Sequence, residues 1–342
     1  MRFPRKVSSS SAGLNGPAAR AACASHLLCV LLGSGFASAP DAADWVPTQP
    51  LKIVAHTAPG GGADVFARQV GEIVRQAKLL PVPVEILNRA GGGGAVAINF
   101  VHEKRGDPSY LLCVTNVLLT TPMTQKGLPT YKEFVPVVVM ASDTNAIHVL
   151  ASSPYRTARD LIEAARSKPN SITHAFGAFG GTDHIIGFQL AKAAGVQFKY
   201  VAFRGGGEAT VALLGGHVDF VTGNPSETRA YVEAGKLRVL GIVGDTRLAL
   251  FPDVPTLREQ GIPLAGTYAV FRGFVAPPGV SRAAAEAYAE VFRKVMVTPE
   301  WKRFVSDNQL VGEYSDPTGM AKFLDERNAQ LAQALSEISR TK

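Results

Sequence analysis

The chain has 342 residues, of which 46% are hydrophobic, and a formal net charge of +7. Its first 39 residues carry four of the 35 basic residues and no acidic residue, so the remainder holds 31 basic against 28 acidic residues, a net charge of only +3. Such a weak positive charge gives no indication of nucleic-acid binding.

The N-terminal 39 residues are typical of a secretory signal peptide. Basic residues precede an apolar stretch at about 21–36, and the small residues Ala37-Ser38-Ala39 follow it. The apolar stretch is too short, and too often interrupted by polar residues, to span a membrane. We therefore expect the chain to be exported and cleaved after Ala39.

Beyond this segment, short apolar runs alternate with helical patterns, which predicts an α/β architecture with mostly parallel strands. The expected strands cover residues 51–55, 82–87, 110–115, 135–140, 146–151, 172–176, 198–203, 218–222 and 237–243. Apolar spacing predicts helices over 64–77, from Thr157 to before Pro169, and from Asp183 to Gly195. A strand over 268–276 and two amphipathic helices, 281–297 and 317–338, complete the chain.

The mature chain is too long for one hydrophobic core, which favours two domains. Cys23 and Cys29 would leave with the signal peptide, so Cys113 remains alone. Because it lies in the apolar run Tyr110–Val114, we expect it to be a buried core residue.

A glycine-rich turn over Thr57–Asp64 connects the first expected strand to the first expected helix. A turn without side chains at a helix N-terminus presents backbone N–H groups and the positive end of the helix dipole, which together suit a carboxylate or phosphate. Related turns occur at Asn88–Gly94 and Gly177–Asp183. Three such turns predict an anion-binding site lined by loops.

Three charged residues near these turns have two interpretations each. Asp64 either caps its own helix or contacts a ligand. Arg204 either holds a ligand carboxylate or pairs with Glu208 at the surface. Arg272 lies in an apolar run and needs a partner, which is either a ligand or an internal carboxylate such as Asp64.

Cofactor, metal and catalytic motifs are lacking in the sequence. Gly92, Gly94 and Ala97 match the dinucleotide fingerprint, but Thr115 and Asn116 stand where its acidic residue is expected. The histidines do not have metal-binding spacing, and no nucleophile elbow is present. We therefore expect no cofactor, no metal and no enzymatic activity.

An ordered series of motifs resembles the Bug-type receptors, the periplasmic substrate-binding proteins of tripartite tricarboxylate transporters. The series runs through Pro59–Asp64, Asn88–Gly93, Gly180–Thr182, Phe203–Gly205, Leu213–Asp219, Ala234–Arg238, Phe251–Thr256 and Ala276–Gly279. The resemblance covers the whole mature chain.

The resemblance implies a type II periplasmic-binding-protein fold, in which two α/β lobes close over a ligand. Lobe 1 would comprise residues 40–144 and 268–342, and lobe 2 residues 145–267. The hinge would lie near Asp143–Asn145 and Ala265–Tyr268.

The resemblance also implies that the first and third turns grip a ligand carboxylate, largely through backbone amides. The residues assigned to this grip are Thr57, Ala58, Gly60, Gly61, Asp64, Gly177, Ala178, Gly181, Thr182 and Asp183. We predict that three further residues contact the other end of the ligand and so determine which ligand binds: Arg204, Asn224 and Arg272. Replacing Gly61 by proline removes one amide donor and is expected to abolish binding.

The function expected from this resemblance is capture of an organic di- or tricarboxylate for a membrane permease, by a receptor that is commonly monomeric. Two alternatives stay open at the level of sequence. One is a ligand-sensing subunit that contacts a sensor kinase, and the other is an exported enzyme acting on a carboxylate.

Overall fold

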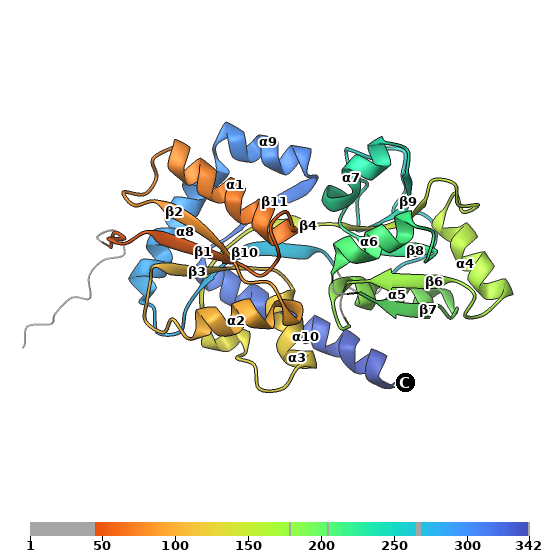
Figure 1. Cartoon of the computed structure of the whole chain (residues 1–342), viewed down its shortest axis with the longest axis horizontal. Helices are drawn as coiled ribbons and strands as arrows, with labels where there is room; N and C mark the ends of the chain where they lie inside the picture. The colour runs from red at the N-terminus through yellow and green to blue at the C-terminus, as the bar shows by residue number, and fades with distance from the viewer. Residues whose placement is uncertain (1–44, 178, 204, 265–267, 341–342) are drawn as a thin grey trace, which may run out of the picture. The chain divides into compact units, whose positions relative to one another are not determined.

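The computed structural model describes residues 45–177, 179–203, 205–264 and 268–340, all within the compact unit that runs from Pro40 to Lys342. The strands form two separate sheets, one of six strands and one of five (Figure 1). No helix among the described residues combines the length and the apolar character that crossing a membrane requires.

The six-stranded sheet takes its strands from both ends of the chain. It contains β1 (Leu51–Ala55), β2 (Val84–Asn88), β3 (Tyr110–Val114), β4 (Val135–Asp143), β10 (Val270–Ala276) and β11 (Leu310–Ser315). Their order across the sheet is β11-β4-β10-β3-β1-β2. β1 is parallel to β2 and β3, whereas β10 is antiparallel to its neighbours β3 and β4, and β11 is antiparallel to β4.

Helices cover both faces of this sheet. One face packs against α1 (Gly62–Gln76), α8 (Arg282–Met296) and α9 (Pro299–Asp307). The other face packs against α2 (Ala95–His102), α3 (Val117–Thr124) and α10 (Pro317–Arg340). Strands buried on both faces must be apolar at nearly every position, which explains the continuous apolar runs of β1, β3 and β4.

The five-stranded sheet is contiguous in the chain. It contains β5 (Asn145–Leu150), β6 (Thr173–Phe176), β7 (Lys199–Ala202), β8 (Phe220–Gly223) and β9 (Leu237–Val243), in the order β7-β6-β8-β5-β9. β6 is parallel to β7 and β8, and β5 is antiparallel to β8 and β9. Its core includes residues of α4 (Ala158–Ser167) and α5 (Thr182–Ala194), and a second cluster includes residues of α6 (Gly206–Leu214). The remaining helix, α7 (Pro225–Glu233), packs against β9.

The prediction of mostly parallel strands is wrong, because only four of the nine strand pairings are parallel. β4, β5, β9 and β10 lie in antiparallel pairs, yet they are as apolar as parallel strands. Because helices cover these strands on both faces, they are apolar at nearly every position. Their sequence therefore does not indicate whether they run parallel or antiparallel to their neighbours.

The chain changes sheet twice. β4 ends at Asp143 and β5 begins at Asn145, while the return path lies between β9 and β10. The Nδ2 atom of Asn145 donates to the carbonyl of Tyr268 at 2.9 Å, which ties the two crossovers together. The predicted lobe boundaries fall at these sheet changes, although residues 265–267 lie outside the described residues. The division into two lobes stays a prediction.

Helix α10 packs against helices beside both sheets. It packs against α3 beside the first sheet and against α5 beside the second (Figure 1). Near its C-terminal end, Glu337 accepts hydrogen bonds from Gln189 at 2.9 Å and Lys192 at 3.0 Å, both on α5. A helix assigned by sequence to lobe 1 therefore also contacts α5, a helix that packs beside the second sheet.

Candidate functional site

The first glycine turn is held by its own hydrogen bonds. Gly60 N–H donates to Oδ2 of Asp64 at 2.8 Å, and Gly61 N–H donates to the carbonyl of Ala58 at 3.0 Å. Asp64 N–H in turn donates to Oγ1 of Thr57 at 3.2 Å. Gly60 has a φ of +85°, which favours glycine at this position. Thr57, Ala58, Gly60, Gly61 and Asp64 thus all shape the turn, and their ligand contacts stay a prediction.

Asp64 stabilises the turn from within. Its carboxylate accepts from Nε of Arg68 at 3.0 Å and from Nδ2 of Asn88 at 2.8 Å, in addition to Gly60. Burial alone would raise its pKa, but these hydrogen bonds outweigh burial and hold the pKa below its usual value. The Asp64 carboxylate is thus bonded within the turn and to Arg68 and Asn88, and a ligand contact by Asp64 stays a prediction.

The amides that stay available on this turn belong to the next two residues. Gly62 and Ala63 begin helix α1, and their N–H groups have no hydrogen-bond acceptor among the described residues. The Gly61 amide, which the sequence favoured as a donor, is already engaged with Ala58. A Gly61→Pro change would therefore break the turn itself, and it would not remove a donor that faces a ligand.

The turn before α5 repeats this arrangement. Gly177 N–H donates to Oδ2 of Asp183 at 3.3 Å, and Gly181 is the N-cap of the helix. Oγ1 of Thr182 accepts from Nδ2 of Asn116 at 3.0 Å, a bond that links the two sheets. Burial raises the pKa of Asp183. The predicted site residue Ala178 lies outside the described residues.

The N-terminus of α6 meets this turn closely. A Cβ atom at Gly177 would lie 2.5 Å from the backbone nitrogen of Gly206, so only glycine allows this approach. A Cβ at Gly206 would lie 3.6 Å from Oε2 of Glu227 and 4.0 Å from Oδ2 of Asp183. Three helix N-termini, those of α5, α6 and α7, therefore meet here. The predicted site residue Arg204 lies outside the described residues.

Arg272 projects from β10 and is 5% exposed. It pairs with Asp143 at the end of β4, and not with Asp64 as the sequence analysis suggested. Ser226 Oγ also donates to Asp143, at 3.2 Å. Burial alone would lower the pKa of Arg272, but the adjacent Asp143 carboxylate outweighs burial and raises it, so the guanidinium stays charged.

Asn224 fixes the crossover beside this pair. It is the N-cap residue of α7, and its Nδ2 atom lies 3.4 Å from the carbonyl of Asp143 and 3.2 Å from that of Thr144. These contacts position the helix that carries Glu227. A ligand contact by Asn224 itself stays a prediction.

Five residues from both sheets form what we call the inter-sheet cluster: Gly62, Asp143, Asp183, Glu227 and Arg272. A Cβ atom at Gly62 would lie 2.8 Å from Oε1 of Glu227 and 3.0 Å from Nη1 of Arg272, so the start of α1 touches both side chains. The cluster thus brings together the first turn, the turn before α5 and Arg272, as the sequence predicts.

Glu227 is a cluster member whose carboxyl group is strongly perturbed by its surroundings. Surrounding protein raises its pKa to about 7, chiefly by desolvation, and the charges of Asp143 and Asp183 add to this rise while Arg272 opposes it. The residue as a whole is exposed. Its carboxyl group is therefore surrounded by both sheets while water can still reach it.

No group of three or more His, Cys, Asp or Glu residues among those described could hold a metal ion. His148 and His174 are fully buried, and burial lowers their pKa to about 4 and about 3. Cys113 is buried, as expected, and burial raises its pKa to about 12, which leaves it a protonated thiol.

The second glycine turn serves a different purpose. Gly92 and Gly93 accept hydrogen bonds through their carbonyls, from Gln125 at 2.9 Å and Thr121 at 2.6 Å. The turn therefore packs against helix α3 and its C-terminal end.

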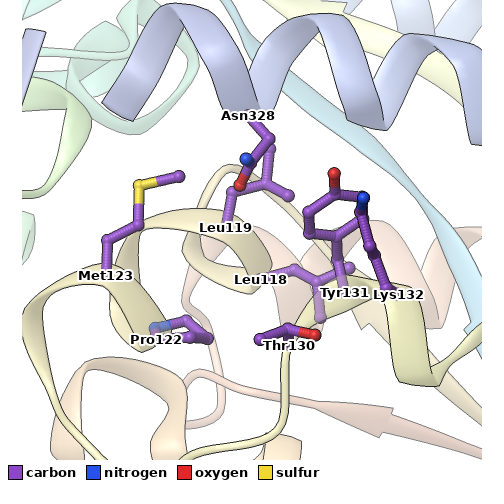
Figure 2. Close-up of a pocket in the computed structure, with 8 residues that line it drawn as sticks. All are labelled: Leu118, Leu119, Pro122, Met123, Thr130, Tyr131, Lys132 and Asn328. Atoms are coloured by element: carbon purple, nitrogen blue, oxygen red, sulfur yellow. The ribbon is translucent and has the colours of Figure 1, made fainter. Parts of the chain in front are cut away.

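An open pocket of about 280 Å³ lies between α3, the segment around Tyr131 and helix α10 (Figure 2). Apolar side chains form its floor, and Asn328 extends toward it from α10. The volume lies below the usual range of small-molecule sites, and none of its lining residues belongs to the inter-sheet cluster.

Residues 66–339 match the model of the tripartite tricarboxylate transporter family receptors. This match covers far more than half of the chain. The chain belongs to this family. A relative from Cupriavidus necator, described as a UPF0065 protein in the gbd 5′ region, is 30% identical over 86% of the chain and 89% of its own length.

Solved structures share the fold of this chain. MatC from Rhodopseudomonas palustris, with bound malate, has a TM-score of 0.76 at 22% identity and covers 84% of this chain and 99% of its own. The R. palustris protein Rpa4515, with adipate, has a TM-score of 0.78 at 23% identity and covers 86% and 99%. The receptors of this family bind solutes in the periplasm and are not enzymes.

Sequence reasoning missed Asn116, Asp143 and Glu227 as site residues. Asn116 and Asp143 each follow or end an apolar strand, and polar residues at strand ends are a usable signal in α/β sheets. Glu227 gave no such signal, because an acid in the first turn of a helix is normally a cap.

Proposed function

We propose that this receptor captures an organic di- or tricarboxylate in the periplasm and delivers it to a membrane permease of the tripartite tricarboxylate type. The observation that carries the proposal is the pair of N–H groups of Gly62 and Ala63, which lie beside Arg272 and have no acceptor within the described part of the chain. A carboxylate placed there would accept both hydrogen bonds at the positive end of α1.

The ligands of the solved relatives support the same class of ligand. Malate and adipate are both short dicarboxylates. Two or three charge-assisted hydrogen bonds contribute about 1.5–3 kcal/mol each, which approaches the roughly −8 kcal/mol of a micromolar complex.

Isothermal titration of the purified mature protein with malate, adipate and citrate tests this proposal. We expect at least one of the three to bind with micromolar affinity. The absence of heat with all three acids would reject the di- or tricarboxylate assignment.

A Gly62→Ala variant tests the position of the grip. The added methyl group would occupy the space between Glu227 and Arg272, so we expect at least a tenfold loss of affinity, about 1.4 kcal/mol. Both neighbouring atoms are side-chain ends that can shift, so the melting temperature should change little.

Gly207→Ala on helix α6 is the matched control, because a Cβ atom there meets nothing within 4 Å. It should bind as the wild type does. Wild-type affinity in Gly62→Ala would place the ligand away from the start of α1.

Cleavage after Ala39 is part of the same proposal. Mass spectrometry of protein taken from the periplasmic fraction should give a chain that begins at Pro40. An intact N-terminal segment in that fraction would contradict cleavage at this position.

A further inference from the structure

Glu227 stands beside the place where the proposed function puts a ligand carboxylate. Its Oε1 atom lies 2.8 Å from the Cβ position of Gly62, at the start of α1, and its Oε2 atom lies 3.6 Å from that of Gly206, at the start of α6. The carboxyl group therefore lies between two helix N-termini and close to the unpaired amides of α1.

Three elements place charged groups around this carboxyl group. Arg272 on β10 lies nearby, but its charge is matched by Asp143 on β4. Asp183 on α5 is a second acid next to the same glycine, Gly206. No cationic side chain among the described residues forms an ion pair with Glu227.

These charges around Glu227 are unfavourable for the carboxylate of the proposed ligand. An ionised Glu227 would repel an ionised ligand carboxylate at the start of α1, and Arg272, which already pairs with Asp143, offsets only part of this repulsion. A protonated Glu227 would instead donate a hydrogen bond to that carboxylate.

We propose that Glu227 is a specificity-determining residue that takes up one proton from solvent when a carboxylate binds and donates it as a hydrogen bond to the ligand. The ligand stays an anion, and the complex carries one proton more than the separate partners. This inference rests on the proposed function, because it requires a carboxylate at the start of α1.

The acid–base behaviour of Glu227 agrees with this geometry. Its pKa of about 7 in the free protein means that little free energy is needed to protonate it near neutral pH. A bound carboxylate raises this pKa further by like-charge repulsion. Binding therefore becomes tighter as pH falls, by up to tenfold per pH unit above about pH 7, and levels off below pH 7.

Titrations with malate and adipate between pH 6 and pH 8.5 test the inference. Simple carboxyl groups are ionised throughout this range, so the ligands themselves do not take up protons. Titration in phosphate and in Tris, which differ in ionisation enthalpy, measures the protons bound. We expect an uptake that approaches one proton per ligand at pH 8 and above.

A Glu227→Gln variant mimics the protonated acid at every pH. Its affinity should be constant within twofold from pH 6 to pH 8.5, its proton uptake should be absent, and at pH 8.5 it should bind about 30-fold more tightly than the wild type, as expected for 1.5 pH units above a pKa of about 7. Glu300→Gln is the control, since Glu300 also lies exposed in the first turn of a helix that begins with proline. It should retain the wild-type pH dependence.

The outcomes separate this inference from the proposed function. Binding without proton uptake, or uptake that persists in Glu227→Gln but disappears in Asp183→Asn, would overturn the role of Glu227 and leave the function intact. Proton release would also overturn it, and would indicate a ligand that brings a cationic group to an ionised Glu227. No binding of either acid would reject the function and this inference together.

Discussion

Arg272 and Asp143 form a charge pair from which water is almost excluded, with side-chain exposures of 6% and 1%. Each charge depends on the other, because an isolated charge in such surroundings loses its hydration without compensation. The pair also joins β10 to β4 at the point where the chain leaves the first sheet. The pair therefore contributes mainly to stability. Because Asp143 lies against Arg272, it also weakens the attraction between Arg272 and a ligand carboxylate.

Replacing Arg272 by methionine should therefore destabilise the protein by about 3–5 kcal/mol, because Asp143 is left buried and unpaired. Urea denaturation monitored by tryptophan fluorescence measures the loss. The double variant Arg272→Met with Asp143→Leu should recover a large part of it. A single variant as stable as the wild type would show that water solvates Asp143 freely.

At the residue scale, the sequence predicts which segments meet but not which atoms pair. The first turn, the turn before α5 and Arg272 were predicted to converge, and Gly62, Asp183 and Arg272 lie in one cluster. The partner of Arg272 could not be predicted, because Asp143 is 129 residues away along the chain. The sequence assigns the free amides to Gly60 and Gly61, but only coordinates show that these two bond to Asp64 and Ala58.

At the scale of elements, the expected strands and the longer helices are all present, with ends that differ by at most three residues. The missed elements α2, α3, α6, α7, α9 and β11 are short, with at most nine residues each. Several lack a clear apolar face or contain an unusual residue, as α3 does with Pro122. Short helices gain their stability from tertiary packing, which sequence periodicity does not reveal.

Helix α10 contributes to a hydrophobic core that both sheets share. Its buried side chains are apolar apart from Arg327, and they belong to a core cluster that extends from the first sheet into the second. Leu331, which is 2% exposed, lies in this stripe.

Leu331→Ala should lower the free energy of unfolding by about 2–5 kcal/mol, since it opens a cavity in a shared core. Gln333→Ala on the exposed side of the same helix should change it by less than about 0.5 kcal/mol. Equilibrium urea unfolding checks both values. A Leu331→Ala loss below about 1 kcal/mol would mean that α10 is not packed as described.

At the scale of the whole molecule, three neutral histidines make stability depend on pH: His148 and His174 are fully buried, and His56 is half-buried. Burial lowers the pKa of His56 and His148 to about 4 and that of His174 to about 3, against about 6.5 in an unfolded chain. Between pH 6.5 and pH 4 the unfolded chain therefore binds more protons at these sites. Their contribution to stability is complete above pH 6.5 and is lost as pH falls.

His148→Gln isolates one of these groups, because glutamine can still bond to Thr228, the present partner of His148 Nε2 at 2.8 Å. Between pH 6 and pH 4.5 the variant should lose stability less steeply than the wild type, by about 1.4 kcal/mol per pH unit. His217→Gln, at an exposed position, is the control. Identical slopes for His148→Gln and the wild type would contradict a neutral His148.

The position of β10 has a consequence for the order in which the protein can fold. This strand lies between β3 and β4, yet it begins only at Val270, after the entire second sheet. During synthesis, β3 and β4 are complete long before the strand that must join them exists, so each keeps an open edge. A nascent chain therefore cannot finish its first sheet until nearly all of it has left the ribosome.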